Sequence, residues 1–360
     1  MKVLKLQEIQ DILVGCTILG TGGGGSLDEG LESVKRAFEK GYKFKLLDFD
    51  EVDDDKYYIN PYFCGSVSPK EEKKELYNEL VMAVEALENY MDVKFDGVVS
   101  IEYGGGNTGQ AMSAAAEMGK FIVDGDAAGR AVPELQFSTY FVTGKPIYPF
   151  SVATKFGDIG IFPYVKDDAR AEALSRFMAV GSEGSVGMAD HPIKGNLLKE
   201  SVIPNALSYA GKVGKAQREA VKNSEDPIEK IINSANGHLL FEGIVKEGTE
   251  WGKKDGFTVG TICIEGTNYY YENTFKIWYK NENMISWKND EPFITCPDLI
   301  CVVDNKTGYP ITNPNCKVGD CVAVLGFESH DLWKTEKGLS ILNPRFFGFD
   351  MDCRYIKDVL

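Results

Sequence analysis

The sequence has few of the residues and patterns on which common catalytic centres depend. Its 360 residues include three histidines, too few for a histidine-rich metal centre. The eight cysteines are scattered and none forms a CxxC pair, which argues against a zinc ribbon or a disulfide framework and favours buried free thiols. Neither a GxSxG nucleophile motif nor a P-loop lysine is present. The cofactor stays open, and a divalent metal would depend on carboxylate ligands.

Positive charge and long apolar runs are also scarce. The 39 Lys and Arg residues against 54 Asp and Glu give a formal charge of −15, a field that repels nucleic acid. No apolar stretch approaches the roughly 20 residues that span a bilayer, and the N-terminus has no signal-peptide core. We therefore expect a cytoplasmic homo-oligomer that acts on a small molecule and binds neither nucleic acid nor membrane.

The order of predicted elements divides the chain into an α/β part and a β part. A strand, a glycine loop, an Ala-rich helix and a second strand alternate over residues 95–123, which predicts parallel βαβ units. Strand-like runs without helices between them begin near residue 240. We predict a largely parallel sheet with flanking helices in an α/β domain over 1–239, a β-rich domain over 240–326, and a tail over 327–360 that packs back on the α/β domain. The further predicted helices cover residues 4–14, ending near Gly15, and residues 27–41, 70–91, 167–179 and 203–222.

A first glycine run lies between an apolar segment and a predicted helix start. It contains Gly22, Gly23, Gly24 and Gly25. Glycines before a helix N-terminus can present backbone N–H groups to a phosphate or a carboxylate. A tight turn that needs left-handed residues explains the run equally well.

A second glycine run follows a predicted strand directly. This segment contains Glu102, Gly104, Gly105, Gly106 and Asn107. Asp124 and Asp126 end the next predicted parallel strand, and ligands of open α/β sheets bind at the carboxyl ends of strands. If the strands are neighbours, three carboxylates converge there to hold a hard cation or to perform acid–base work. Helix capping and Asp-Gly-Asp turn chemistry are the structural alternative.

Three more side chains are predicted to complete the site. Arg130 follows the acidic pair and can bind a substrate carboxylate, or else form an ion pair with Glu134. His330 is a candidate for proton transfer, and Trp333 a wall for a flat ring. Packing and simple hydrogen bonding are the alternatives for these two. We predict that both glycine runs border one cleft and that His330 approaches it.

Several motifs, in this order along the chain, resemble one known family. They are LGTGGG (19–24), EYGGGN (102–107), DGDAAGRAVPELQ (124–136), VIPNALS (202–208), PDLI (297–300), GYPI (308–311), HDLW (330–333) and PRFFG (344–348). The pattern resembles a family of domains of unknown function whose N-terminal half is described as S-methyl-thiohydantoin desulfurase-like. Its members are associated with hydantoin-utilisation genes. The resemblance extends over residues 5–353, and Ala128 and Asp331 depart from the usual family pattern.

The resemblance implies two domains and a hydrolase-like attack of water on a small cyclic amide or thioamide, such as a hydantoin or thiohydantoin. Developing negative charge would face the N–H groups of the glycine runs. A hydantoinase-type protein is an implied partner. The alternative is a non-catalytic, small-molecule-binding or regulatory subunit of a hydantoin-utilisation system.

Overall fold

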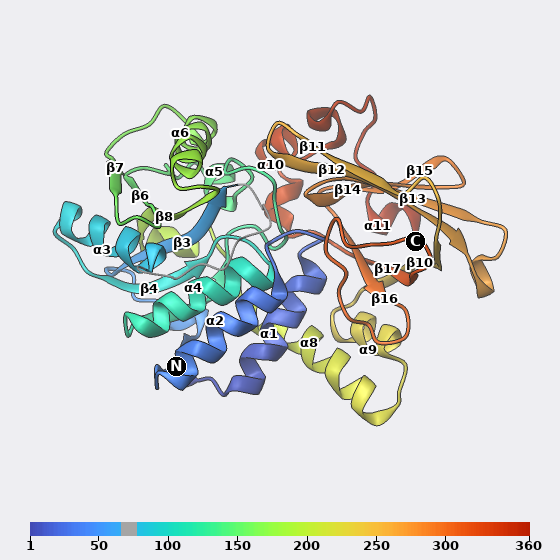
Figure 1. The fold of residues 1–360 in the computed structure, drawn as a ribbon, viewed down its shortest axis with the longest axis horizontal. Helices are drawn as coiled ribbons and strands as arrows, with labels where there is room; N and C mark the ends of the chain where they lie inside the picture. Colours follow the sequence, from blue (N-terminus) through green and yellow to red (C-terminus); the bar gives the residue numbers. More distant parts are fainter. Residues whose placement is uncertain (66–77) are drawn as a thin grey trace. The chain divides into compact units, whose positions relative to one another are not determined.

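The computed structural model describes residues 1–65 and 78–360 (Figure 1). The chain folds into two compact units, each built from segments that are not contiguous in the sequence. Unit 1 comprises Met1–Ile9, Leu27–Ala128 and Glu134–Leu207, and unit 2 comprises Gln10–Ser26, Gly129–Pro133 and Ser208–Leu360. These units differ from the segments 1–239, 240–326 and 327–360 that the sequence suggests, because the chain passes from one unit to the other several times.

Unit 1 is built on a mixed sheet. Its central strands β2, β5, β4 and β3 are parallel neighbours, and antiparallel strands extend the sheet on both sides. The predicted strands at 95–102 and 120–123 are therefore adjacent, as the α/β prediction requires. In sheet order the strands are β1 (Lys2–Val3), β2 (Lys45–Leu47), β5 (Phe121–Asp126), β4 (Phe95–Ser100), β3 (Tyr57–Gly65), β8 (Ser185–Lys194), β6 (Phe150–Ala153) and β7 (Ile159–Phe162), and β9 (Ile203–Pro204) pairs with β5.

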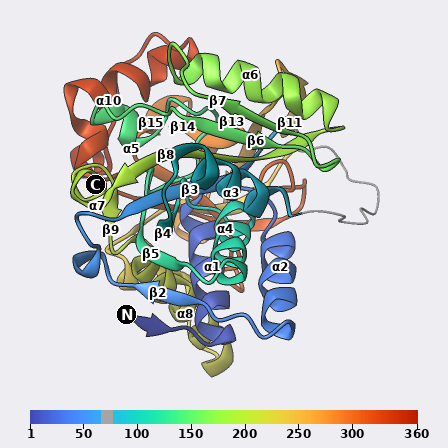
Figure 2. The same ribbon diagram turned by 90° about the vertical axis from the view of Figure 1, so that its left-hand side faces the viewer.

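Helices cover both faces of this sheet. Figures 1 and 2 show α6 on one face and α4 on the other, with α2 beyond α4. Tyr62 of β3 packs in a core cluster with Ala171 and Ala179 of α6, and Tyr58 packs in a second cluster with Tyr140 and Leu198. The helices of unit 1 are α2 (Leu27–Glu39), α3 (Glu79–Met91), α4 (Gly105–Glu117), α5 (Thr139–Val142), α6 (Asp168–Gly181) and α7 (Gly195–Lys199), with a 3₁₀ turn η1 (Phe49–Glu51).

One predicted helix end, and part of another predicted helix, can be compared with the structure. Asn78 caps α3, because its Oδ1 accepts the N–H of Val81 at 3.4 Å. The part of the predicted helix over residues 70–77 lies outside the described residues. The predicted helix end near Gly41 agrees with the structure, where α2 ends at Glu39 and Gly41 has a φ of +81°.

Unit 2 contains a sheet in which every strand pair is antiparallel. Its strands, in order, are β15 (Glu291–Thr295), β14 (Glu282–Lys288), β13 (Thr274–Lys280), β12 (Phe257–Gly266), β10 (His238–Val245), β17 (Cys321–Phe327) and β16 (Leu299–Asp304), and β11 (Glu250–Lys254) pairs with β12. Ile262 pairs with Ile277, and Ile264 with Phe275, so alternate residues of two strands face one core. The predicted combination of an α/β part and a β-rich part is confirmed.

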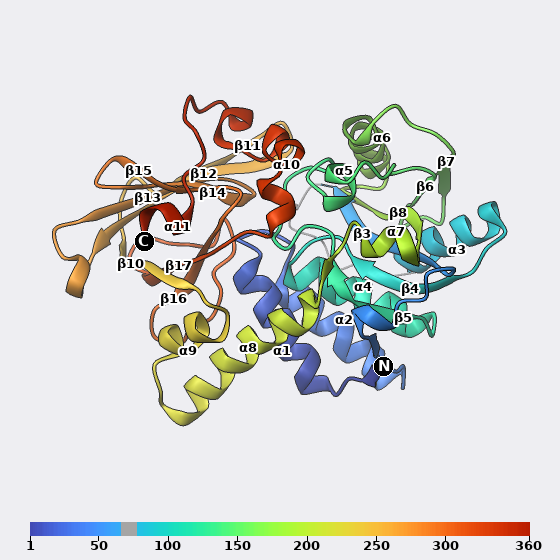
Figure 3. The same cartoon turned by 180° about the vertical axis from the view of Figure 1, so that it is seen from behind.

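Two helices that lie mostly in unit 2 run past each other (Figure 3). They are α1 (Leu6–Leu19), most of which belongs to unit 2, and α8 (Ala206–Asn223). A Cβ on Gly15 would lie 1.8 Å from the carbonyl oxygen of Ala210, so only glycine fits at this position. The prediction that the first helix ends near Gly15 is therefore wrong. The glycine serves close helix packing, and the helix continues to Leu19.

The C-terminal segment packs on the antiparallel sheet of unit 2. The N–H of Ile356 donates to Asp298 Oδ2 at 2.9 Å, and the ring of Phe349 lies 4.9 Å from that of Trp278. Residues 327–360 thus belong to unit 2 by their contacts. The sequence suggests instead that this tail packs on the α/β domain. The remaining elements of unit 2 are α9 (Pro227–Ser234), η2 (Asn268–Tyr270), η3 (Asp331–Lys334), α10 (Glu336–Ile341), η4 (Pro344–Phe347) and α11 (Ile356–Val359).

Across residues 1–65 and 78–360, every helix is too short or too polar to span a lipid bilayer.

Candidate functional site

Two of the predicted carboxylates lie at the carboxyl ends of β4 and β5 in unit 1. Ser100 pairs with Asp126 across these strands, and the N–H of Ala127 donates to Ser100 O at 3.0 Å. Glu102 follows β4 by two residues. The exposed fraction is 8% for Glu102 and 0% for Asp126. Both side chains are therefore buried at one edge of the sheet, where ligands of α/β proteins bind.

The second glycine run forms the start of α4 beside Glu102. Gly104 is the N-cap residue, and the first intrahelical bond runs from the N–H of Thr108 to Gly104 O. The N–H groups of Gly105, Gly106 and Asn107 therefore precede the hydrogen-bonded part of the helix, at its positive end. Asn107 Nδ2 donates to Glu102 Oε1 at 2.7 Å, so the helix start also orients the carboxylate.

Turn chemistry explains part of the Asp-Gly-Asp segment. The N–H of Ala128 donates to Asp126 Oδ1 at 2.9 Å, a side-chain contact two residues along the chain that is typical of an Asx turn. Asp124 is 3% exposed, and its main-chain oxygen accepts the N–H of Asn205 at 2.8 Å. One oxygen of Asp126, Oδ1, therefore takes part in the Asp-Gly-Asp turn, which is the structural role suggested as an alternative to catalysis.

The carboxylates do not form a metal site on their own. Within the described ranges 1–65 and 78–360, no group of three or more His, Cys, Asp or Glu side chains has a geometry that could hold a metal ion. A hard cation prefers six to eight oxygen ligands, or a regular octahedron of them. In the structure, Glu102, Asp124 and Asp126 are therefore not arranged as a ligand set for such a cation.

The first glycine run lies in unit 2 and packs against that unit's own polar side chains. Positive φ angles occur at Thr21 (51°), Gly22 (93°), Gly24 (78°) and Gly25 (80°). A Cβ on Gly23 would lie 2.0 Å from Glu282 Oε1, and one on Gly22 would lie 2.5 Å from Asn313 Nδ2. Because a carboxylate already approaches this loop, the structure favours the tight-turn interpretation over a phosphate-binding one.

Arg130 is fully buried in unit 2, and its donors are already used. Nε–H donates to its neighbour's carbonyl at Ala131, Nη1 to Pro297 O at 2.9 Å, and Nη2 to Asn283 O at 3.0 Å and Thr21 Oγ1 at 3.3 Å. A guanidinium has five N–H donors and no acceptor. The contacts contradict the predicted role in binding a substrate carboxylate, because Arg130 instead ties residues 129–133 into unit 2.

His330 and Trp333 also have local structural roles in unit 2. His330 is the N-cap of η3, where its Nδ1 accepts the N–H of Leu332 at 3.3 Å, and burial lowers the pKa of its imidazole. Trp333 is fully buried, which favours packing over the wall of a pocket. That His330 approaches the carboxylates of unit 1, and that the two glycine runs share a cleft, stay predictions.

Unit 1 also buries a row of polar side chains that the sequence does not predict as a site. Tyr62 OH donates to Asp190 Oδ2 at 2.5 Å, and Asp190 Oδ1 lies 2.9 Å from His191 Nδ1. Burial, followed by the charge of Asp190, raises the pKa of Tyr62. The adjacent Asp and His are visible in the sequence, but Tyr62 lies 128 residues from Asp190, and only the pairing of β3 with β8 brings them together.

A cysteine nucleophile is disfavoured in this region. Cys64 is buried on β3, and burial, followed by the charge of Glu172, raises the pKa of its thiol. The thiolate is the reactive form of cysteine. Cys64 is therefore a core thiol, as the sequence analysis prefers.

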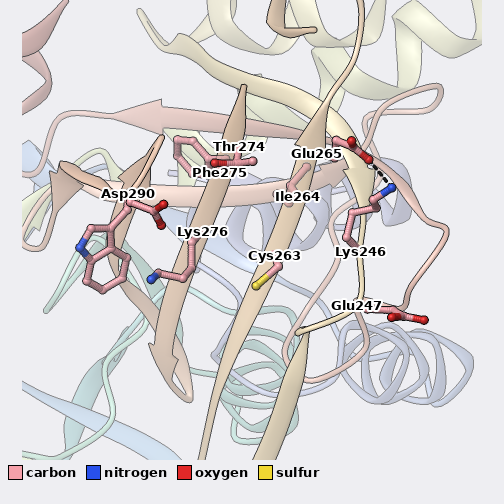
Figure 4. A pocket seen from close by; sticks show the side chains of 10 residues that line it. Lys246, Glu247, Cys263, Ile264, Glu265, Thr274, Phe275, Lys276 and Asp290 are labelled. Atoms are coloured by element: carbon pink, nitrogen blue, oxygen red, sulfur yellow. Dashed lines mark ion pairs between the residues drawn. The ribbon is translucent and has the colours of Figure 1, made fainter. Parts of the chain in front are cut away.

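The hollow in Figure 4 lies over strands β12 and β13 of the unit 2 sheet and has a volume of about 360 Å³. Both lysines that line the hollow already have partners. Lys246 forms an ion pair with Glu265, and Lys276 lies 4.8 Å from the ring centre of Trp287. Burial raises the pKa of its thiol, Cys263. None of the residues predicted from the sequence lines this hollow, and we assign it no role.

The fold and the site together describe one class of protein. It combines an α/β unit with an antiparallel β unit, and its carboxylates are buried at the carboxyl ends of the parallel strands. The chain belongs to the S-Me-THD-like (S-methyl-thiohydantoin desulfurase-like) family. Its N-terminal domain model matches residues 7–164 and its C-terminal domain model residues 166–356.

A solved structure supports the fold independently. The chain is similar to the crystal structure of a protein from Chromobacterium violaceum, with 21% sequence identity and a TM-score of 0.80. The match covers 99% of this chain and 100% of that one. Comparison with curated proteins gives no match.

Proposed function

We propose that the chain is a hydrolase-type enzyme acting on a small cyclic amide or thioamide of the hydantoin or thiohydantoin type. The observation that carries the proposal is the burial of Glu102 and Asp126 at the carboxyl ends of two adjacent parallel strands, beside the start of α4. The family description, which refers to a desulfurase of S-methyl-thiohydantoin, supports the choice of ring.

The arrangement supplies two things that such hydrolysis needs. Buried carboxylates hold the attacking water by hydrogen bonds and favour the loss of its proton as the water oxygen attacks the ring carbon. The negative charge that develops on the ring oxygen or sulfur is stabilised by N–H donors at the positive end of a helix. Glu102 is oriented by Asn107, and Asp126 is held by the Ala128 N–H, so both carboxylates are fixed before a substrate binds.

The test is a screen of hydantoins, thiohydantoins and S-methyl-thiohydantoins with the purified full-length chain. We expect turnover by the wild type, and a loss of kcat of about 10²- to 10⁴-fold in Asp126→Asn or Glu102→Gln. Asp96→Asn is the matched control, because Asp96 lies on β4 at the opposite end from Glu102. Equal turnover by wild type, Asp126→Asn and Glu102→Gln would remove these carboxylates from the mechanism.

The same screen distinguishes an enzyme from a non-catalytic binding subunit. Calorimetry with each ring compound measures binding whether or not turnover follows. Saturable binding without product, alone or with a hydantoinase-type protein added, would replace the enzyme with a regulatory or carrier role.

A further inference from the structure

Unit 1 holds a histidine whose surroundings resemble those of a positioned proton acceptor. His191 lies on β8 with an exposed fraction of 2%, and its Nδ1 lies 2.9 Å from Asp190 Oδ1. Asp190 is fixed in turn by the hydroxyl of Tyr62 at 2.5 Å. A carboxylate at Nδ1 favours the tautomer that carries its proton there, which leaves the Nε2 lone pair as an acceptor.

The outer end of this ring is buried without being used. Within the part of the chain that the structure describes, His191 Nε2 has no hydrogen-bond partner and almost no exposed surface. Buried polar atoms are normally hydrogen-bonded. The backbone of His191 also has a φ of +45°, a left-handed conformation that non-glycine residues rarely adopt and that is concentrated at functional sites.

The ring is held from the side by α5. Tyr140 stacks on His191 with ring centres 4.4 Å apart and an interplanar angle of 17°. The Tyr140 hydroxyl donates to Asn60 Oδ1 at 3.0 Å, and Asn60 Nδ2 donates to the main chain of β4 at Val99 at 3.2 Å. The orientation of the imidazole is therefore set by β3, β4, β8 and α5 together.

The helix that carries Tyr140 is bound to the chain directly after Asp126, because the N–H of Thr139 donates to Ala127 O at 2.6 Å. Burial is the main cause of the raised pKa of Tyr140, and the charges of both Asp190 and Asp126 add to it. The charged and titratable groups that contact the imidazole or its carboxylate are Asp190 from β8, Tyr62 from β3 and Tyr140 from α5.

We propose that His191 is the proton-transfer group of this site, with Asp190 and Tyr62 as its positioning residues. This inference rests on the proposed function and adds to it the group that moves the proton. It replaces His330 in that role, since His330 Nδ1 caps η3.

The reaction step balances without a cofactor. The oxygen of water bonds to the ring carbon while Nε2 of His191 takes one water proton. The C–N or C–S bond of the intermediate then breaks, and the proton passes from Nε2 to the leaving nitrogen or sulfur. When the C–N bond breaks, the products are a carboxyl group, which keeps the second water proton, and an N–H group. When the C–S bond of an S-methyl ring breaks, the second proton passes to the ring nitrogen, and the products are a ring carbonyl beside an N–H group and a thiol. No electron is gained or lost overall.

The first experiment needs no substrate. The chain has three histidines, so [¹⁵N]histidine-labelled protein gives three pairs of ring signals, which His238→Gln and His330→Gln assign by elimination. We expect the signal of His191 at neutral pH to show a proton on Nδ1 and none on Nε2. A proton on Nε2 would overturn the proposal, because that atom could not then accept one from water.

The second experiment measures kinetics with a ring compound that the wild type turns over. If the wild type turns over none of the ring compounds, that result contradicts the proposed function and not the role of His191. We expect His191→Gln to lose about 10²- to 10⁴-fold in kcat with KM within a few-fold, while His238→Gln keeps wild-type rates. A kcat of folded His191→Gln within threefold of wild type would overturn the proposal.

Positioning by Asp190 is tested by a change that packing alone would not produce. Asp190→Asn replaces the carboxylate that holds the proton on Nδ1 with an amide, so the [¹⁵N]histidine signals of His191 should show part of the proton on Nε2, and kcat should fall with KM within a few-fold. Tyr62→Phe should lower kcat by a smaller factor, because the carboxylate stays in place. If Asp190→Asn lowers the rate while the His191 signals still show a proton on Nδ1 alone, Asp190 has a structural role only and the proposal fails.

Discussion

The contact between α2 and α4 offers a sharp test of how packing sets the geometry of the site. A Cβ on Gly30 of α2 would lie 1.8 Å from the carbonyl oxygen of Gly105, the first residue of α4. In the reverse direction, a Cβ on Gly109 would lie 2.7 Å from the Cα of Gly30. The contacted atoms belong to the backbone and cannot rotate away, so Gly30→Ala forces the two helices apart.

The expected cost follows from two opposing effects. Inserting a methyl group into a packed interior typically costs about 1–3 kcal/mol, and a backbone obstacle places this case at the upper end. Alanine recovers about 1 kcal/mol, because glycine is the poorer residue in a helix interior. We expect Gly30→Ala to lower the free energy of unfolding by about 2 kcal/mol, which for a domain of this size corresponds to about 4–8 °C in Tm.

The control is Gly181→Ala at the end of α6, where an added Cβ would meet no atom within 4 Å. Urea and thermal unfolding followed by circular dichroism should show a loss for Gly30→Ala and little change or a gain for Gly181→Ala. Because Gly105 begins the helix that orients Glu102, Gly30→Ala should also reduce turnover more than Gly181→Ala does. Equal stability of the two variants would refute the close-packing argument.

Two further predictions concern buried charges. Glu88 is 4% exposed at its side chain; burial alone would raise its pKa, but hydrogen bonds from Lys120, Lys94 and the Phe95 N–H hold that pKa below its usual value. The folded state therefore binds fewer protons than the unfolded state, so this contribution to stability is present above about pH 4.5 and is lost as the pH falls through the depressed pKa of Glu88. Glu88→Gln should lower the free energy of unfolding by about 2–3 kcal/mol at pH 7. When this free energy is measured in urea as a function of pH, the variant should also lose less of it on acidification than the wild type does. Arg130→Met should destabilise the chain by about 3 kcal/mol or more, because it leaves several buried carbonyl oxygens without a donor, and an unchanged urea midpoint would contradict the cross-linking role.

The position of the candidate site could be predicted in part from local patterns. The alternation of strand, glycine loop, helix and strand placed Glu102 and Asp126 at the ends of two parallel strands, and the structure pairs those strands directly. The role of Arg130 could not be predicted in this way. Its partners at Asn283 and Pro297 lie more than 150 residues away, and no local pattern records which carbonyl groups a side chain will meet.

The glycines illustrate the same limit. Gly15 has the sequence appearance of a helix stop, yet it lies inside α1 because Ala210 of another helix needs its space. Gly23 has the appearance of part of an anion-binding loop, yet a carboxylate of β14 approaches it. A missing Cβ has several physical uses, and only the neighbouring atoms decide which one applies.

By itself, the sequence determined what depends on composition and on short-range order: the two kinds of architecture, the edge of the sheet where the carboxylates lie, and the family. Only the tertiary structure decided that Tyr62, Asp190 and His191 form one buried row. Hydrophobic periodicity encodes which segments become strands, since it acts over a few residues. Which strands pair, and which polar side chains they bury together, depends on packing summed over the whole unit, and that information is not present in any single segment.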